Sequence, residues 1–318
     1  MKKEKVLIVK LGYTETLDSS LSLTTSLGDV LRTTFILHFF KDNHVTWLVD
    51  SKARPLLDNN EYIAEVIEYT PDSINLLKKA NFDIVINFEK LPEISSLLGS
   101  LNSKEYFGFG LNELNNNGKN HHQEIKRLVS LSRDVSQRKK NKDYWQTILA
   151  ESLGKAWQGE EYILGYKPKK NQSFDIGFNW ATSDKWTNKM WPNAYWKKLE
   201  SLLKSTYSIS WQKGLNSLYE YIDWINSCRL IVTCDSLGLH LCLALKKRVI
   251  ALFGPTSHKE IYFYDRGSFL LPDSPYDCIP CLKPICDKKR QCVEYISSER
   301  VKEKIENEFK NHIPSQKV

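Results

Sequence analysis

The sequence lacks any long apolar run. None of its apolar stretches approaches the roughly 18 residues that a transmembrane helix needs. The basic start, Met-Lys-Lys-Glu-Lys, is typical of a signal peptide, but the apolar stretch Val6–Leu11 is too short for one. No small-residue cleavage site follows it. We therefore expect a cytoplasmic protein, and we interpret this stretch as part of its first strand.

Two recognition motifs are also missing. No G-x-G-x-x-G follows the first strand, where the chain reads Leu11-Gly12-Tyr13-Thr14-Glu15, and this argues against a nucleotide-sugar epimerase or dehydrogenase. The net charge of +7 would attract nucleic acid, but we find no nucleic-acid recognition module among the motifs. We therefore expect no nucleic-acid partner.

What is present indicates a globular α/β protein. With 41% hydrophobic and 26% charged residues, the chain can bury a sizeable core, and its 318 residues are enough for two domains of roughly 150 residues each. Apolar strands alternate with amphipathic helices, first from Lys5–Leu11 and helix Leu27–Phe40 onward, and again after a polar linker at 167–173. Such alternation is typical of βαβ units and parallel sheets. We predict two Rossmann-like domains facing a cleft.

The segment Leu230–Thr256 carries the clearest candidate site. One strand ends at Asp235-Ser236 and the next at Gly254-Pro255-Thr256, so both ends lie at the same edge of a parallel sheet. A helix begins between them, and its first N–H groups, at Ser236–Leu239, can bind a pyrophosphate. His240 lies in the first turn. The alternative is that Asp235 and Ser236 only cap the helix and that His240 is a core or surface residue.

Two other segments also have polar residues at element ends. In Asn179–Trp196, Lys189 comes shortly before Trp191-Pro192 and could neutralise the charge that develops on a diphosphate leaving group. The alternative is a solvated lysine. In Ser26–Thr34, Gly28-Asp29 stands at the start of the first helix, where the alternative is a helix-capping carboxylate beside a turn glycine.

Taken together, these segments resemble the ADP-heptose:lipopolysaccharide heptosyltransferases, glycosyltransferase family nine. The resemblance spans nearly the whole chain in the right order. It is carried by the sequences K-V-L-I-V-K-L-G, L-G-D-V-L-R-T-T, K-M-W-P-N-A-Y-W and D-S-L-G-L-H-L-C-L-A-L-K-K-R-V-I-A-L-F-G-P-T. It implies a GT-B fold and no catalytic cofactor. It also implies transfer of heptose from ADP-heptose, with inversion, to a lipopolysaccharide inner-core or related glycan or glycolipid acceptor.

The resemblance also implies roles for individual residues. Asp29 would be the general base, Lys189 would contact the donor phosphates, and Asp235 with His240 would hold the nucleotide sugar. The donor side would further include Ser236, Gly238, Leu239, Gly254 and Thr256, and the acceptor side Gly28 and Arg32. In this scheme residues 1–166 form the acceptor-side domain and 167–296 the nucleotide-sugar domain, while the C-terminal helix in 297–318 packs back on the first domain.

The chain departs from the family pattern in three places. Tyr13–Ser26 is an insertion after the first strand, Leu237 stands where the family turn has glycine, and only a few residues separate Trp211 from the Leu218 helix. The alternatives to heptosyl transfer are a non-catalytic nucleotide-sugar scaffold or sensor, a different nucleotide sugar, or a protein acceptor.

All seven cysteines lie in the second half of the chain. Four of them cluster within one segment, as Cys278, Cys281, Cys286 and Cys292. In a cytosolic protein this crowding favours a structural zinc or iron with four thiolate ligands, and the alternative is reduced thiols or disulfides. The other three, Cys228, Cys234 and Cys242, we expect to be buried as small hydrophobes.

Basic residues concentrate between Lys119 and Lys142, where eight Lys or Arg stand against two acids. The stretch is either a solvated helix face or a patch for an anionic acceptor or lipid surface. The second interpretation predicts peripheral contact with the cytoplasmic face of the inner membrane.

Overall fold

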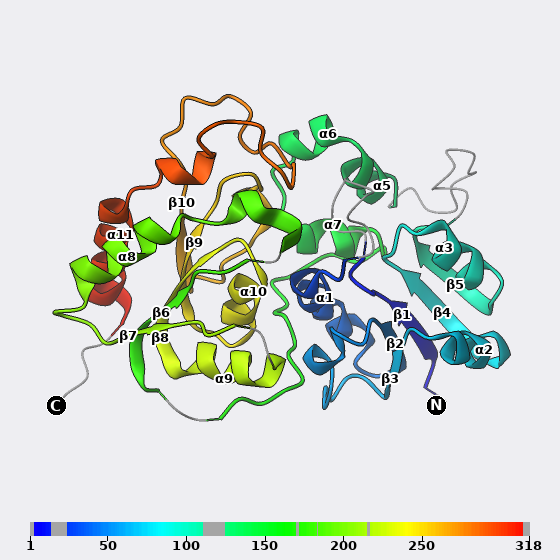
Figure 1. Ribbon diagram of the computed structural model, residues 1–318. Helices are drawn as coiled ribbons and strands as arrows, with labels where there is room; N and C mark the ends of the chain where they lie inside the picture. Colours follow the sequence, from blue (N-terminus) through cyan, green and yellow to red (C-terminus); the bar gives the residue numbers. More distant parts are fainter. Residues whose placement is uncertain are drawn as a thin grey trace. The chain divides into compact units, whose positions relative to one another are not determined.

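The protein consists of two compact units, Met1–Lys167 and Pro168–Val318, each built on a five-stranded parallel sheet (Figure 1). The structure is a computed structural model that describes residues 3–13, 24–110, 125–169, 172–182, 184–214 and 217–313. Across these residues, none of the helices has both the length and the apolar character to cross a membrane.

The first sheet has the strand order β3-β2-β1-β4-β5. Its strands are β1 (Lys5–Val9), β2 (His44–Val49), β3 (Glu65–Glu68), β4 (Asn81–Asn87) and β5 (Asn102–Gly108). The central strand β1 is apolar on both faces because it is covered on both, and Val6 pairs with Val45 and Ile84 on its two neighbours. The order reverses between β1 and β4, which is where open parallel sheets bind ligands.

Helices cover both faces of this sheet (Figure 1). α2 (Pro71–Lys79) and α3 (Pro92–Gly99) pack on the face formed by Leu7 and Val9. On the other side lies α1 (Leu27–Thr33), which continues as a 3-10 helix, η2 (Thr34–Phe40). The predicted helical stretch Leu27–Phe40 is therefore confirmed, with its second half in 3-10 geometry. The hydroxyls of Thr33 and Thr34 donate to backbone carbonyls one turn back, at 2.7 Å each, and such bonds compete with regular helix geometry.

For the long polar stretch Gln123–Leu153 the sequence predicts mostly helical structure, and the structure has three helices in its described part. These are α5 (Ile125–Arg133), α6 (Val135–Lys140) and α7 (Trp145–Glu151). Asp134 accepts hydrogen bonds from the N–H groups of Ser136 and Gln137, so it acts as an N-cap that starts a new helix. Gln123 itself lies outside the described residues.

The second sheet has the order β10-β9-β8-β6-β7, with its reversal between β6 and β8. Its strands are β6 (Phe174–Asn179), β7 (Ile209–Trp211), β8 (Cys228–Cys234), β9 (Arg248–Leu252) and β10 (Gly267–Leu270). An aromatic cluster fills the core on one side, where the rings of Trp191 and Trp196 meet edge to face with centroids 4.9 Å apart.

Four α-helices complete the second unit within the described residues: α8 (Asn193–Leu203), α9 (Leu218–Ser227), α10 (Leu237–Ala244) and α11 (Ser298–His312). The apolar residues Val301 and Ile305 of α11 lie in the core of the second unit, and Ser298 Oγ donates to the carbonyl of Tyr195 at 2.9 Å. We expected this helix to pack on the first domain. It belongs to the second unit instead, because its apolar stripe is buried there.

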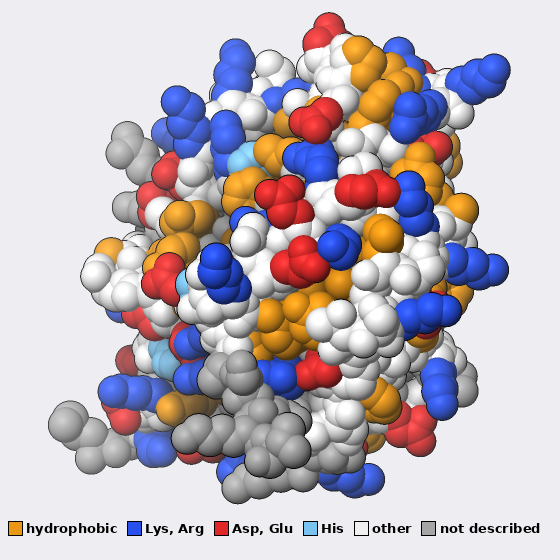
Figure 2. Space-filling model, turned by 90° about the vertical axis from the view of Figure 1, so that its left-hand side faces the viewer, with side chains coloured by type: hydrophobic (Ala, Val, Ile, Leu, Met, Phe, Trp, Pro, Cys, Tyr) orange, Lys and Arg blue, Asp and Glu red, His pale blue; other side chains and the backbone are white. Residues whose placement is uncertain are grey.

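The outer side of α8 and α11 is a surface of mixed charge. Figure 2, which views the molecule from the side where these helices lie in Figure 1, shows Lys and Arg interspersed with Asp and Glu. One such pair, Lys198 with Glu299 at 2.6 Å, links the two helices. Because both partners are more than half exposed, the pair adds little stability.

Candidate active site

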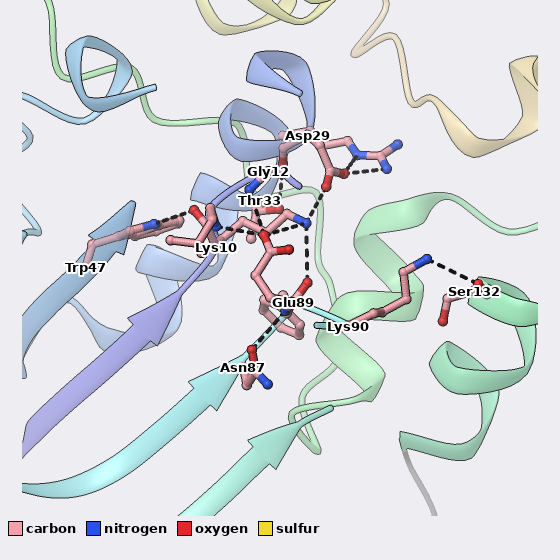
Figure 3. Close-up of polar contacts among 12 residues, drawn as sticks. Lys10, Gly12, Asp29, Thr33, Trp47, Asn87, Glu89, Lys90 and Ser132 are labelled. Carbon is pink, nitrogen blue, oxygen red and sulfur yellow. Dashed lines mark hydrogen bonds and ion pairs between the residues drawn. The ribbon is translucent and has the colours of Figure 1, made fainter. Parts of the chain in front are cut away.

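The switch point of the first sheet places polar residues from two neighbouring strands side by side. Lys10 follows β1 directly, and Glu89 follows β4 after one intervening residue. The fully buried Glu89 carboxylate accepts hydrogen bonds from the N–H groups of Leu11 and Gly12, at 2.7 and 2.6 Å (Figure 3). Gly12 has a φ of +94°, and a Cβ there would lie 2.9 Å from the carbonyl oxygen of Ser26. Glu89 therefore fixes the conformation of the chain as it leaves β1.

Asp29 lies on α1 next to this point and is held by two cations (Figure 3). It forms a buried ion pair with Lys10, and the guanidinium of Arg32 lies 2.6 Å from its other oxygen. Burial by itself raises the pKa of Asp29, but the attraction of Lys10 and Arg32 is stronger and brings the pKa well below its ordinary value. The carboxylate is therefore ionised at neutral pH and is a weak base.

The switch point of the second sheet is organised by Asn179, the last residue of β6. Its buried amide nitrogen donates to Thr233 Oγ1 at 2.7 Å, and its amide oxygen accepts from the hydroxyl of Tyr221 at 2.8 Å. Gly238, in the first turn of α10, leaves room for this amide, since a Cβ there would lie 2.2 Å from Asn179 Nδ2. The glycine is thus required for close packing between β6 and the start of α10.

Four of the predicted donor-side residues lie together at this second switch point. Lys189, at the end of the 3-10 helix η4 (Asp184–Lys189), places its Nζ 3.0 Å from a carboxylate oxygen of Asp235. Burial raises the pKa of Asp235, but the charges of Lys189 and His240 outweigh this effect and, with the nearby hydroxyl of Thr256, lower the pKa to about 2. The same ammonium lies 4.5 Å from the ring centroid of Trp186.

α10 begins directly beside this ion pair. Its N-cap residue, Ser236, makes no side-chain capping bond, so the hydroxyl does not occupy the backbone N–H groups of the first turn. Leu237 starts the helix and does not belong to the described residues with positive φ. The turn therefore does not need the glycine that the family pattern has at this position.

Most of the other residues predicted for the two sites are buried within the units. Gly28 and Leu239 are buried within α1 and α10. Gly254 is packed against the cysteine-rich segment, since a Cβ there would lie 2.5 Å from Val293 and 2.9 Å from the sulfur of Cys292. This close packing explains why the position is occupied by glycine, which has no Cβ.

The sequence analysis did not identify the residues that organise each of the two sites. Lys10, Glu89 and Asn179 are polar residues at the carboxyl ends of buried strands, and that position alone could have identified them. The insertion after the first strand, Tyr13–Ser26, lies largely outside the described residues.

The cysteine-rich segment contacts the loops that carry the donor-side residues. The N–H of Leu282 donates to the carbonyl of Pro255 at 2.8 Å, and the Asn188 amide donates to the carbonyl of Lys283 at 2.6 Å. Asn188 precedes Lys189, and Pro255 precedes Thr256. The segment therefore supports both loops from one side.

All seven cysteines are described, and each is a free thiol. As expected, the helix and strand cysteines are buried, and burial raises the pKa of Cys228 to about 11 and of Cys234 to about 12. In the cysteine-rich segment, burial and the nearby thiols raise the pKa of Cys292 to about 11. Nevertheless, among the described residues no three or more His, Cys, Asp or Glu side chains are arranged to hold a metal ion. The side chains as placed do not form the predicted metal site.

Comparison with known proteins finds a family similarity in the second unit. Residues 214–290, which include β8 and α10, match glycosyltransferase family 9 (heptosyltransferase). Over 85 residues the chain is 31% identical to lipooligosaccharide heptosyltransferase 2 of Campylobacter jejuni, a match that covers 26% of this chain and 27% of that relative. This part of the chain is therefore similar to glycosyltransferase family 9, and the chain spans about a quarter of the length of the curated relative that it matches.

Solved structures extend the similarity to the fold of the whole chain. E. coli heptosyltransferase WaaC with ADP-2-deoxy-2-fluoro heptose superposes with a TM-score of 0.63 at 18% identity, covering 95% of this chain and 99% of WaaC. The iron-containing dodecameric glycosyltransferase TibC of enterotoxigenic E. coli gives 0.57 at 12% identity, covering 99% of this chain and 78% of TibC. The predicted GT-B fold with two Rossmann-like units is thereby confirmed.

Proposed function

We propose that this protein is a glycosyltransferase that moves heptose from ADP-heptose to a lipopolysaccharide inner-core or related glycan or glycolipid acceptor, with inversion. The observation that carries the proposal is the Lys189–Asp235 pair beside the open start of α10, at the switch point of the second sheet. The likeness to a heptosyltransferase of Campylobacter, and to WaaC with its ADP-linked fluoro-heptose, supports this donor.

On the donor side, the first-turn N–H groups of α10 bind the diphosphate, and Lys189 neutralises the charge that grows on it as the sugar leaves. Asp235 and the ring of Trp186 hold the lysine in position before the donor arrives. A preoriented cation of this kind stabilises the transition state without having to reorganise. No catalytic cofactor is needed in this scheme.

On the acceptor side, Asp29 takes the proton of the attacking hydroxyl in a single displacement at the anomeric carbon. Lys10 and Arg32 oppose protonation of Asp29, since each stabilises its charged form. The hydroxyl must therefore become acidic, by bonding to the anomeric carbon, before Asp29 can accept its proton. Proton transfer comes late in the reaction.

The donor assignment is tested by calorimetric titration with ADP-heptose, ADP-glucose and UDP-glucose, one at a time. We expect the tightest binding for ADP-heptose. If another nucleotide sugar binds more tightly, that compound is the donor instead. If a nucleotide sugar binds but is not turned over with any glycan or protein acceptor, a scaffold or sensor is favoured. If none of the three binds, the proposal is wrong.

We also propose that a metal ion binds the four cysteines of the segment Cys278–Cys292, once their side chains turn toward one another. The spacing of the four cysteines supports this proposal, as does the effect of the nearby thiols on the pKa of Cys292. The similarity in fold to the iron-containing TibC also supports it. Elemental analysis should find about one zinc or iron per chain, lost in the double variant Cys281→Ser/Cys286→Ser together with thermal stability. Metal-free protein with the melting temperature of the parent would contradict it.

Finally, we propose that the basic stretch contacts an anionic membrane surface. Lys139 and Lys140 on α6 are exposed, whereas Arg138 is half-buried against Trp145 and does not belong to the solvated face. The variant Lys139→Glu/Lys140→Glu should bind anionic vesicles less than the parent does, by a margin that shrinks as salt rises. Turnover on a small soluble acceptor should stay the same. Equal vesicle binding would make the stretch an ordinary solvated helix face.

A further inference from the structure

Lys189 stands in a short and irregular part of the chain. It ends η4, a 3-10 helix of six residues whose backbone is non-helical at Trp186. Because short 3-10 turns have poorer hydrogen-bond geometry than α-helices, η4 does not fix its own position. Lys189 is nevertheless almost fully buried, with its Nζ 3.0 Å from Asp235. Contacts from outside η4 must therefore hold this lysine in place.

Two side chains on either side of Lys189 supply such contacts. Asn188 Nδ2 donates to the carbonyl of Lys283 at 2.6 Å, and Trp191 Nε1 donates to the carbonyl of Ile296 at 2.9 Å. The Trp191 ring belongs to the aromatic core of the second unit, which explains why it is buried. Asn188 is polar and yet only 1% exposed, and its amide oxygen has no hydrogen-bond partner in the described part of the chain. The bond to Lys283 is thus what orients the Asn188 side chain.

The preceding residue of the cysteine-rich segment, Leu282, holds a second loop of the same site. Its N–H donates to the carbonyl of Pro255 at 2.8 Å, and the next residue, Thr256, has its hydroxyl near the Asp235 carboxylate. Leu282 is buried and has a φ of +56°, a left-handed conformation that a leucine keeps only where its surroundings enforce it. Two consecutive residues of one segment therefore hold the two loops that meet at Asp235.

We propose that Asn188 is a positioning residue for the diphosphate site, through which the cysteine-rich segment holds Lys189 ready for the donor. The inference rests on the proposed function, since the position of Lys189 matters only if this lysine contacts the donor phosphates. Without the bond to Lys283, the lysine keeps its charge but has to be ordered when the donor binds. That ordering costs affinity, because a preorganised site has already lost this freedom.

The inference is tested by calorimetric titration of the full-length protein with ADP. Asn188→Leu keeps nearly the volume of the side chain but cannot donate to Lys283. It should weaken ADP binding about three- to tenfold, the size expected for one lost hydrogen bond between neutral groups. Asn226→Leu is the matched control, since it removes an amide bond of 2.8 Å to the carbonyl of Lys169 elsewhere in the second unit. The control should bind ADP as the parent does.

A double variant shows whether Asn188 acts through the lysine. In the Lys189→Ala background, Asn188→Leu should cause no further loss of ADP affinity, because no lysine is left to be positioned. A residue that only stabilised the fold, or that contacted ADP directly, would cause the same loss in both backgrounds. An equal loss would therefore overturn the inference. If Asn188→Leu does not fold, Asn188→Ala removes the same bond and is compared in the same way.

Failure of the inference and failure of the proposed function give different results. If the parent binds ADP and Asn188→Leu binds it equally well, the inference is wrong and the proposed donor site is unaffected. If the parent does not bind ADP, the proposed donor site is wrong, and the role of Asn188 is disproved with it.

Discussion

Replacing Asp29 with asparagine should lower turnover by about 10²–10⁴-fold, the usual cost of losing a general base. The amide keeps the shape of the side chain but can no longer accept the proton of the acceptor hydroxyl. Donor affinity should stay unchanged, since the proposed diphosphate contacts come from Lys189 and α10. Steady-state kinetics at saturating acceptor, with calorimetry for the donor, would measure both quantities.

This variant should also be less stable, because Lys10 and Arg32 lose a buried anionic partner. Arg32→Gln is the matched control, since it breaks the same ion-pair network but keeps the carboxylate. It should lower the melting temperature but reduce turnover far less than Asp29→Asn does. If Asp29→Asn keeps more than about a tenth of the parent's turnover, with chemistry rate-limiting, another base is at work.

Lys189→Ala should weaken use of the donor by about 30- to 150-fold, corresponding to about 2–3 kcal/mol for a lost charge-assisted contact. Asp235→Ala should also weaken nucleotide binding, because it removes the carboxylate that holds the lysine at 3.0 Å. Calorimetric titration with ADP and with ADP-heptose would separate the diphosphate contribution from that of the sugar.

Lys197→Ala, at an exposed position on the neighbouring helix α8, removes an equal charge and should bind nucleotide as the parent does. Unchanged nucleotide affinity in both Lys189→Ala and Asp235→Ala would mean that the donor binds elsewhere in the protein.

Local patterns in the sequence were sufficient to predict most of the strands and some of the polar residues beside them. Asp235, Ser236 and Lys189 could be recognised because each stands next to an apolar strand or an aromatic helix start. The order of the strands could not be predicted, because it depends on pairing between distant segments. Leu11 and Glu89, for example, are 78 residues apart and meet only because β4 lies beside β1.

The remaining differences have local physical causes. The sequence predicted the helical stretches but not their subdivision, in which threonine hydroxyls bond one turn back near the start of η2 and Asp134 caps a new helix. β10 went unpredicted because it is a four-residue edge strand, too short to show a pattern. The unit in which α11 packs was not predicted, because an apolar stripe shows that a helix is buried on one side but does not show which sheet covers it.

The most direct test of the account is the mass of the product formed when the protein is given ADP-heptose and an inner-core glycan. The account predicts an acceptor heavier by one heptose, an equal amount of ADP released, and almost no product from Asp29→Asn. An acceptor of unchanged mass, with protein that is folded and binds the donor, would contradict it.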